Sequence, residues 1–569
     1  MKRENWSSHI GVILAVAGSA VGLGNFLKFP GQVATYGGAS FMIAYVISFF
    51  FIALPLSIVE WTMGREGGLL GFNSPVGIFH SLWKNKCAKY MGVLAVMLTT
   101  IVFSYYIYIE AWCLGYAVNF AFDNLHFKTL AESAGFFNEF TGISADGGAF
   151  SFSFKKLLPY FLIVFVLNFY IIYRGVSKGI EFFCKYAMPM LFLLGLILVV
   201  RVMCLGTPDI NKPEQSLNTG LGFMWNPEQV FLEKFDSGKN EWVQAERLVG
   251  TPAIARGENI AAKTPGEFRI VKISLLKQLL NPQIWIAAAG QVFFSLTVGF
   301  CAIMTYASYI KKNDDIVLGA VSAASTNEFC EVCIGGLITV PAAVAFFGVS
   351  ATLGSCLSLF DLGFKILPVF FSSLWCGALF GFMFFSLLFL GAVTSSLSML
   401  QPAIAFFGEA VKFERKHAVW VMIALTVFPS FFVAYFSKNL KALDTFDFWC
   451  GQVCIYILTM IMAAVFVYVI GTKRGIRMAN RGSLMKAPII TAYILQYFAP
   501  FALFAIFILW ISKEVKILFE GKSSYFSDII GKNPDKIAVM SVCIMLFIYL
   551  FFAGIAKFSK TYKSRRLRK

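Results

Sequence analysis

The amino-acid sequence predicts an all-α polytopic membrane protein with about twelve transmembrane helices. Of its 569 residues, 58% are hydrophobic and only 14% are charged, and the mean hydropathy is +0.72. These values exclude a soluble multi-domain protein. A second observation is a series of long apolar windows, since about 20 apolar residues in a helix cross the roughly 30 Å of hydrocarbon in a bilayer. A third is the position of the basic residues between those windows.

The windows that predict transmembrane helices follow one another along the whole chain. They lie at residues 9–35, 39–62, 90–122, 157–173, 179–203, 283–310, 316–349, 370–407, 417–436, 444–470, 488–511 and 538–558. The first window follows Lys2 and Arg3 and has no cleavage-type region after it. We therefore interpret it as a retained helix and not as a signal peptide.

The formal net charge of +17 points to a membrane topology and not to a nucleic-acid partner. With the N-terminus in the cytoplasm, most basic clusters fall in cytoplasmic loops, which is the positive-inside pattern. The clusters are Arg65, Lys84 and Lys86; Arg174 and Lys178; Lys311 and Lys312; Lys412, Arg415 and Lys416; Lys473, Arg474, Arg477 and Arg481; and the tail 557–569. Both termini are expected in the cytoplasm, and for the tail we favour anchoring near anionic lipid over partner binding.

The first window is interrupted at its centre. Gly18, Gly22 and Gly24 fall within seven residues, and each glycine weakens a helix by about 1 kcal/mol relative to alanine. Backbone groups freed at membrane depth are tolerated where they line a cavity and contact an ion or a substrate. The sixth window has a similar interruption at residues 294–300. Two interrupted segments in corresponding halves predict a binding site near the membrane midplane.

The twelve cysteines predict neither a disulfide framework nor a metal centre. Most of them lie inside predicted helices, where cysteine packs as a small apolar residue. Cys330 and Cys333 have the C-x-x-C spacing, but no second pair completes a zinc site. Packing is the favoured interpretation.

Eight blocks of sequence resemble the neurotransmitter:sodium symporter family, and its bacterial amino-acid members in particular. They are ENWSSHIGVILAVAGSAVGLGNFLKFPGQ (4–32), GREGG (64–68), YYIYIEAW (105–112), IWIAAAGQVFFSLTVGF (284–300), TNEFCEV (326–332), PAAVAFFG (341–348), VTSSLSMLQP (393–402) and DFW (447–449). The blocks occur in family order along nearly the whole chain. The resemblance implies the leucine-transporter fold, a five-plus-five inverted repeat with broken first and sixth helices.

This fold divides the chain into four regions. The first inverted repeat, helices 1–5, spans 1–204, and the second, helices 6–10, spans 281–470. Between them, 205–280 forms an extracytoplasmic loop with a polar insert near 231–275, a departure from the bacterial relatives. Helices 11–12 and the basic cytoplasmic tail occupy 471–569. The sequence predicts neither order nor a function for the insert.

The resemblance also implies two sodium sites made of carbonyl, hydroxyl and amide oxygens. The first uses Ala20, Asn25, Ser295, Asn327 and the carboxylate of the substrate. Because the substrate is itself a ligand of this sodium ion, sodium binding and substrate binding are coupled. The second uses the carbonyls of Gly18, Val21 and Gly391 and the hydroxyls of Thr394 and Ser395. Ser295 and Gly391 replace a threonine and an alanine of relatives, and neither change removes an oxygen ligand.

The implied substrate pocket combines backbone of the first break with apolar and hydroxyl-bearing walls. Its residues are Ala20, Gly22, Gly24, Val102, Tyr106, Phe294, Thr297, Phe300, Ser395 and Met399. Gly22 stands where monoamine-transporting members carry an aspartate, so no fixed acid pairs with an amine. The expected substrate is a neutral amino acid with an apolar or aromatic side chain. Without the resemblance, aromatic residues at helical spacing would be interpreted as side chains that pack between helices.

Acidic residues inside predicted membrane helices are functional hypotheses, because their burial is costly. Glu331 occupies the position at which bacterial relatives carry a glutamate in place of bound chloride. Transport is therefore expected to be chloride-independent, with Glu331 taking up a proton when the empty carrier returns. Glu60 and Glu110 are interpreted as partners of unwound backbone.

Two gates follow from the same resemblance. On the outside, Lys28 would face Asp447, and on the inside, Arg3 would face Glu409. Relatives carry arginine at the position of Lys28. Lysine cannot form the planar bidentate pair with a carboxylate, so this outer gate would close less specifically.

The expected function is sodium-coupled import of an amino acid by alternating access, in a multi-pass protein of a prokaryotic inner membrane. The first and sixth helices would rock against the third, fourth, eighth and ninth. The expected partners are the amino acid, two sodium ions and the lipid bilayer. A non-transporting amino-acid receptor or a channel on the same scaffold is the alternative. An enzyme is disfavoured because no nucleophile accompanies a base in the predicted core, and the oligomeric state is not predicted.

Overall fold

The computed structural model describes residues 6–144, 146–147, 153–238, 240–355, 360–520, 524–531 and 533–562. Within this part of the chain, nine helices are long and apolar enough to cross a membrane, or ten if the bent first helix counts as one span. The prediction of a helical, polytopic membrane protein is thus confirmed.

The long spans are mostly composite, because short π-helical segments interrupt the α-helices. Four spans are single α-helices: α6 (Ala88–Ala121), α18 (Gly377–Ala410), α19 (Arg415–Tyr435) and α26 (Lys536–Phe558). Three spans contain one π-helical segment between or before α-helices: α3 (Ala39–Ser48), η2 (Phe49–Ala53) and α4 (Leu54–Leu69); η3 (Val176–Glu181) and α9 (Phe182–Met203); and α15 (Ile316–Glu328), η4 (Phe329–Gly336) and α16 (Leu337–Ser355). The last two are α20 (Lys441–Phe446), η7 (Asp447–Cys454), α21 (Ile455–Ala464), η8 (Val465–Gly471) and α22 (Thr472–Ala479); and α23 (Ile489–Tyr493), η9 (Ile494–Phe498) and α24 (Ala499–Phe519). Such π-helical turns are frequent at functional sites.

Helices also occupy the two remaining predicted windows. The fourth window is α8 (Leu158–Tyr173), an apolar helix of 16 residues. The sixth is divided into α13 (Pro282–Ser295) and α14 (Ala302–Ala307). The count of twelve spans and the inverted repeat remain predictions.

The first helix is broken where the glycines predict it. α1 (His9–Ala20) is followed by η1 (Gly24–Lys28) and α2 (Phe29–Tyr36), and the two parts meet at an angle of 47°. Val21 ends α1 in an extended conformation, with φ −73° and ψ 104°. The break therefore lies between Ala20 and Gly24.

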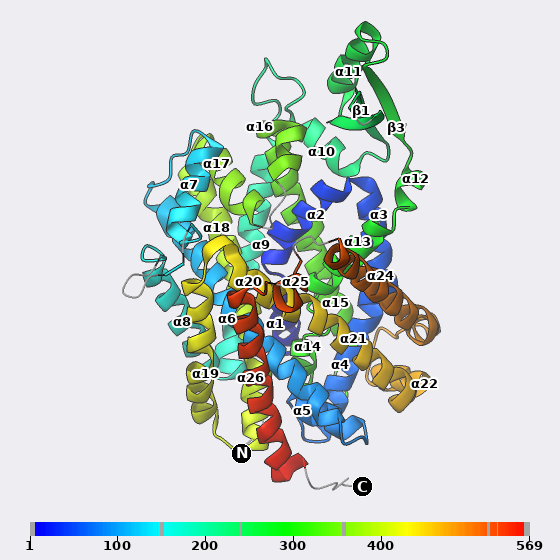
Figure 1. Ribbon diagram of the computed structural model, residues 1–569. Helices are drawn as coiled ribbons and strands as arrows, with labels where there is room; N and C mark the ends of the chain where they lie inside the picture. Colours follow the sequence, from blue (N-terminus) through cyan, green and yellow to red (C-terminus); the bar gives the residue numbers. More distant parts are fainter. Residues whose placement is uncertain are drawn as a thin grey trace.

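The core of the molecule is built on α6 and α18, which have 34 residues each and pack along one another. α1 packs against α9, α15 and α18. Shorter helices cover the ends of the bundle: α5 (Pro75–Leu82), α7 (Leu130–Thr141), α10 (Leu217–Trp225), α12 (Leu275–Leu279), α17 (Leu367–Ser372) and α25 (Ser527–Ile530). In Figure 1, α7, α10 and α17 lie at the upper end, whereas α5, α22 and the end of α26 lie at the lower end.

The polar insert is folded. It contains β1 (Gln229–Asp236), β2 (Glu241–Leu248), α11 (Thr251–Lys263) and β3 (Phe268–Ile273). The three strands form an antiparallel sheet in the order β2-β1-β3, and Val230, Leu232, Leu248 and Ala253 form a small core between sheet and helix. Figure 1 shows this unit at the upper end, beyond α10 and α12.

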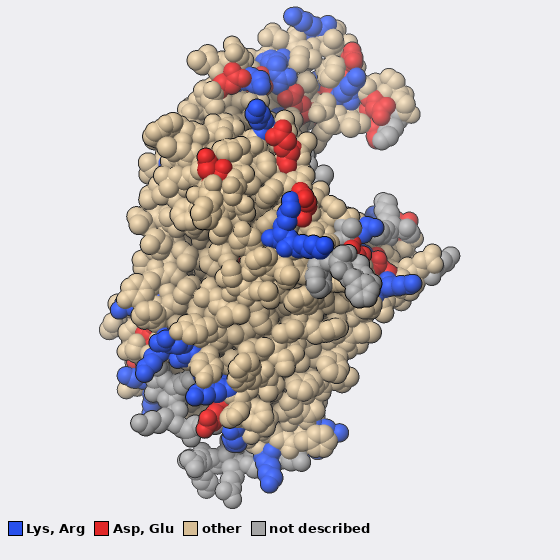
Figure 2. Space-filling view, turned by 90° about the vertical axis from the view of Figure 1, so that its left-hand side faces the viewer, with Lys and Arg blue, Asp and Glu red and all other residues tan. Residues whose placement is uncertain are grey.

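Charged side chains are concentrated at the two ends of the molecule. Figure 2 shows a broad surface without Lys, Arg, Asp or Glu in the lower half of the view, with mixed charges above it, near mid-height and at the top, and mostly basic residues below it. A wide apolar surface on a helical bundle fits contact with lipid hydrocarbon. The basic lower end is the end that the positive-inside pattern would place in the cytoplasm.

Candidate functional site

The break in the first helix is held open by a side chain of the same helix. Asn25 Oδ1 accepts a hydrogen bond from the backbone N–H of Gly22, at 2.9 Å. This bond satisfies one N–H group that lost its helical partner at the break. The carbonyl groups around Gly18 and Val21 stay directed toward α18, as described below.

The sixth helix is broken by positive φ angles. After α13 ends at Ser295, Thr297, Gly299 and Cys301 have φ values of 52°, 90° and 59°. Glu60 of α4 accepts hydrogen bonds from the N–H groups of Gly299, at 3.2 Å, and of Met304, at 3.3 Å. The interpretation of Glu60 as a partner of unwound backbone is therefore confirmed.

Glu110 has a different partner from the one the sequence suggested. It lies fully buried on α6 and accepts a hydrogen bond from the side-chain amide of Asn168 on α8, at 3.0 Å. The hydroxyl of Ser396 on α18 donates to Oδ1 of Asn168, at 2.6 Å. The prediction that Glu110 satisfies unwound backbone is wrong, because a side chain about three turns along α8 reaches it across the helix interface.

The residues of the first implied sodium site form one buried polar cluster. Asn25 donates to Asn327 Oδ1 at 2.8 Å, and Asn327 donates to Ser295 Oγ at 2.6 Å. Glu331 accepts from Gln291 at 2.5 Å and also from Ser295. The cluster joins the first break to α13 and to the α15–η4 span. It brings four oxygen-bearing side chains and a carboxylate together beside the first break, and Ala20 at the end of α1 lines the same cavity as Ser295.

The residues of the second implied sodium site also meet. Ser395 Oγ lies 3.4 Å from the carbonyl oxygen of Gly18 and 3.0 Å from that of Gly391. Thr394 Oγ1 lies 2.9 Å from the Gly391 carbonyl. A methyl group on Gly391 would come within 3.3 Å of the Val21 carbonyl oxygen. Hydroxyls and carbonyls of this kind are hard oxygen donors that suit an alkali cation.

A cavity of about 710 Å³ begins at these breaks and contains all ten predicted substrate residues in its lining. Its walls come from α1, η1, α6, the sixth-helix break and α18. The exposed Thr35 of α2 also lines it, so the cavity reaches the surface at the end of the molecule that carries the insert. Thr297 Oγ1 is buried in this wall without a hydrogen-bond partner.

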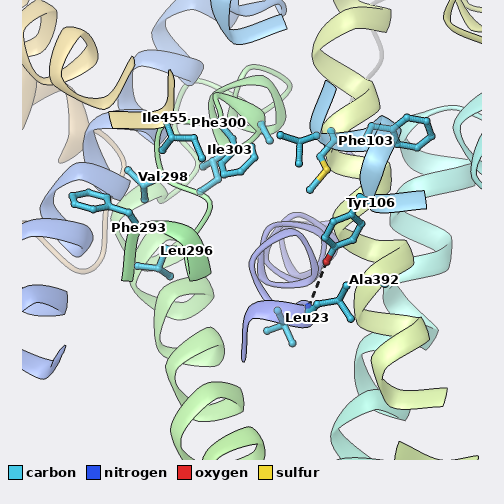
Figure 3. Packing of buried hydrophobic residues seen from close by; sticks show 14 of the residues in the cluster. Leu23, Phe103, Tyr106, Phe293, Leu296, Val298, Phe300, Ile303, Ala392 and Ile455 are labelled. Atoms are coloured by element: carbon cyan, nitrogen blue, oxygen red, sulfur yellow. Dashed lines mark hydrogen bonds between the residues drawn. The ribbon is translucent and has the colours of Figure 1, made fainter. Parts of the chain in front are cut away.

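Tyr106 and Gly22 determine the shape of the cavity beside the first break. The hydroxyl of Tyr106 accepts a hydrogen bond from the N–H of Leu23 at 3.4 Å, and Figure 3 shows the ring reaching from α6 to the break. A Cβ atom on Gly22 would lie 2.7 Å from Ser395 Oγ and 3.0 Å from the Tyr106 hydroxyl. The structure therefore leaves no room for an aspartate at this position.

The outer gate residues both line the cavity but do not contact each other. The ammonium group of Lys28 lies over the ring of Phe294, 3.6 Å from its centroid. Asp447 accepts hydrogen bonds from Tyr105 at 2.8 Å and from Gln452 at 3.2 Å. Among the ion pairs of the described residues, none joins Lys28 to Asp447.

Of the inner gate, Arg3 lies outside the described residues. Glu409 accepts hydrogen bonds from the backbone and hydroxyl of Ser74, at 2.7 and 2.5 Å, and from Tyr562 at 3.1 Å. It therefore fixes the start of α5 to the end of α18. Trp6 donates to the carbonyl of Tyr306 at 3.0 Å and packs against its ring, so the lower end of the first helix is closed against α14.

Fifteen of the 28 residues that line the cavity were not predicted as site residues, among them four at its mouth. Asp444 lies one helical turn before Asp447, and this spacing alone would have placed it on the same face. Leu353, Phe360 and Tyr525 lie outside the sequence blocks described above, and no local pattern distinguishes them. Only the packing of the whole chain brings them to the mouth of the cavity.

Broken helices around a buried polar cluster and a surface-open cavity define a multi-pass membrane transport protein. Residues 3–205 and 264–556 match the model of the Sodium:neurotransmitter symporter family, and the chain belongs to this family. Its members are transporters and not enzymes. The resemblance seen in the sequence is thereby confirmed. The unmatched residues 206–263 include β1, β2 and α11, which marks most of the insert as an addition to the family pattern.

Known relatives cover most of this chain. An uncharacterized sodium-dependent transporter of Haemophilus influenzae is 24% identical over 483 residues, which are 82% of this chain and 89% of the relative. One from Methanocaldococcus jannaschii is 24% identical over 517 residues, which are 89% and 90% of the two chains. The crystal structure of MhsT in complex with L-phenylalanine matches with a TM-score of 0.69 and 25% identity, and the match covers 89% of this chain and 99% of MhsT.

Proposed function

We propose that this protein is a sodium-coupled symporter that imports a neutral amino acid with an apolar or aromatic side chain, independently of chloride. The observation that carries the proposal is the cavity: residues from five separate segments, each expected to contact substrate, line one space beside two helix breaks. Such breaks at midplane depth are typical sites for an anionic substrate group and its coupling cations.

Two sodium sites are proposed at the clusters described above. In the first, the amide oxygens of Asn25 and Asn327 would coordinate the cation. Ser295 adds a hydroxyl, and the carboxylate of the amino acid completes the site. In the second, Gly18, Val21, Gly391, Thr394 and Ser395 supply the oxygens.

The proposed substrate class follows from the walls of the cavity. Val102, Phe294, Phe300 and Met399 present apolar surface, and Gly22 leaves no space for an acid. Tyr106 and the N–H groups at the break are placed to bind a carboxylate. The complex of the structural relative MhsT with L-phenylalanine supports an aromatic amino acid here.

Chloride independence is proposed from Glu331. Its carboxylate accepts hydrogen bonds from Gln291, Ser295, Asn25 and Asn327, at the place where a bound anion would otherwise be needed. Because Glu331 already supplies a fixed negative charge next to the first sodium site, no chloride ion is needed there. When the sodium ions leave, protonation of Glu331 would neutralise it for the return step.

The transport cycle is proposed to alternate access to the cavity. In this structure the cavity reaches the surface at Thr35, and Trp6 closes the opposite side. Closure of the outer side would bring Lys28 from the ring of Phe294 to Asp447. We place the N- and C-termini in the cytoplasm of a prokaryote and the insert outside its inner membrane.

The test is uptake of labelled neutral amino acids into proteoliposomes, with sodium outside or replaced by potassium. Asn25→Ala removes an oxygen ligand of the first site and should abolish uptake. Asn119→Ala is the matched control, because Asn119 lies on α6 with its amide bonded to the carbonyl of Gly115, away from the cavity. Uptake that persists in potassium would contradict the sodium sites, and binding without counterflow would identify the non-transporting receptor.

A further inference from the structure

A second cavity lies between the insert and α16. It has a volume of about 340 Å³, and its walls are residues 211–215, the end of β2 with the start of α11, and residues 347–350 of α16. This volume falls within the range of about 300–1,000 Å³ that is typical of small-molecule pockets. None of the residues proposed for sodium or amino-acid binding lines it.

Arg247 lines this cavity and has an unusual environment for a cation. It is only 7% exposed, yet among the described residues its guanidinium makes a single hydrogen bond, from Nη2 to the carbonyl of Phe223 at 3.4 Å. The ring of Phe223 covers one face of the guanidinium, and Nε is buried without a partner. Burial lowers the pKa of Arg247 to about 10.

The acids of the cavity wall are already paired with another arginine. Arg256 of α11 donates to Glu214 at 2.7 and 3.0 Å and to Glu246 at 2.7 and 3.1 Å. No ion pair in the described part of the chain includes Arg247. Lys212, at the rim, adds positive charge, and its side chain is 61% exposed, with Asp209 at 3.8 Å. Arg256 is paired with both acids of the cavity wall and Lys212 lies near Asp209, which leaves Arg247 as the basic group here without an acidic partner among the described residues.

We propose that this cavity binds a small carboxylate through Arg247. A buried guanidinium without an acidic partner is costly, whereas a carboxylate offers two oxygens that match its planar donors. Lys212 attracts the same group, and Asn211, Gln215 and Ser350 offer further polar contacts. The carboxylate belongs either to a free amino acid or to a simple organic acid. This inference does not depend on the proposed transport function.

The position of the cavity links the insert to the central site. Residues 347–350, which line the second cavity, and Leu353, which lines the central one, lie on the same helix, α16. α16 also has a kink at Gly348, where φ is 78°. A ligand held by Arg247 therefore contacts the helix that forms part of the mouth of the central cavity.

The test is ligand-observed saturation-transfer NMR on the purified full-length protein, with propionate and glycine as probes. Potassium buffer and an Asn25→Ala background remove binding in the central cavity. Arg247→Met should weaken binding of the probe at least about tenfold, since it removes a charge-assisted bidentate contact. Ser350→Phe fills the cavity from its exposed rim and should weaken binding of the probe in the same way. Because this variant retains Arg247, the proposal can still be tested if Arg247→Met does not fold.

Arg269→Met is the matched control. Arg269 lies on β3 of the same insert, pairs with Glu233 at 2.7 Å and does not line the cavity, so its loss should leave binding unchanged. Binding of both probes supports a general carboxylate site, and binding of glycine alone assigns it to amino acids. Absence of a signal, an equal signal in Arg247→Met, or displacement of both probes by an equal concentration of chloride would overturn the proposal.

Discussion

A single methyl group at Gly22 would meet two of the groups that line the substrate end of the cavity. Its Cβ would lie 2.7 Å from Ser395 Oγ and 3.0 Å from the Tyr106 hydroxyl. Overpacking of this kind costs about 1–3 kcal/mol, so Gly22→Ala should raise the KM for amino-acid uptake about tenfold. Gly31→Ala is the control, because Gly31 lines the same cavity with nothing within 4 Å of an added Cβ. Equal KM values in the two variants would contradict the assignment of Gly22 to the substrate site.

The carboxylate of Glu331 leads to a second prediction at this scale. Glu331→Ser removes the only carboxylate that Gln291 and Ser295 contact in the described structure and leaves these donors facing each other. Uptake in chloride-free gluconate medium should fall at least about tenfold, since buried charged hydrogen bonds are lost. Added chloride should restore uptake in the variant and leave the wild type unchanged. A variant that stays inactive in chloride would contradict the anion role.

Residue positions were predicted well where a sequence block fixes a helix break. Ala20, Asn25 and Ser295 reach the cavity or its polar cluster because the breaks place them there, and Ser395 reaches the cavity from the continuous helix α18. Glu110 was assigned the wrong partner, since nothing local indicates that Asn168 lies opposite. Their binding roles remain predictions, whereas their proximity follows directly from the structure.

At the scale of elements, the Asp315 side chain connects two segments on the lower side of the molecule, α15 and the linker between α22 and α23. It caps α15 by accepting from Leu318 at 2.8 Å, and it accepts from Leu484 and Met485 of the linker between α22 and α23, at 2.7 and 3.3 Å. Burial would raise the pKa of Asp315, but the three backbone donors outweigh it and hold the pKa below its ordinary value.

A carboxylate with a lowered native pKa stabilises the fold above its unfolded pKa, near 4, and this contribution is lost as the pH falls through the native value. Asp315→Ala should therefore lower the free energy of unfolding by about 1–2 kcal/mol at pH 7. The difference in this free energy from wild type should be constant between pH 8 and 5 and should shrink below about pH 4. Thermal unfolding of the purified protein in detergent measures this. Asp314→Ala is the control, because the Asp314 carboxylate accepts from the N–H of Lys311 at 3.2 Å, and the backbone carbonyl that accepts from Arg65 is kept in the variant. A difference that grows on acidification would refute this assignment.

The insert shows where element prediction fails. Its charged and glycine-containing sequence indicated a loop, yet β1 and β2 pair over most of their length and α11 covers the sheet. Only four buried residues form its core, so the apolar signal is too weak to stand out from a polar segment. Long membrane helices, in contrast, carry continuous apolar windows that a sequence shows without ambiguity.

At the scale of the whole molecule, the proposed stoichiometry has an electrical consequence. Two sodium ions with a zwitterion carry two positive charges inward, which gain about 4.6 kcal/mol per 100 mV. An imposed inside-negative potential of about 100 mV should then raise accumulation about a thousandfold, at about 1.4 kcal/mol per tenfold. Potassium-loaded proteoliposomes with valinomycin provide the measurement. An increase of about fiftyfold would instead indicate one net charge, as expected if Glu331 returns a proton outward.

The topology can be tested with cysteines that the protein already has. Cys87 lies before α6, on the end of the molecule with α5, whereas Cys204 follows α9 and Cys376 precedes α18, on the end with the insert, and all three are exposed. With the N-terminus in the cytoplasm, a membrane-impermeant maleimide should modify Cys204 and Cys376 in intact cells and Cys87 only in inverted vesicles. Peptide mass spectrometry distinguishes the three sites. Labelling of Cys87 in intact cells would reverse the orientation and place the basic end outside, contrary to the positive-inside rule.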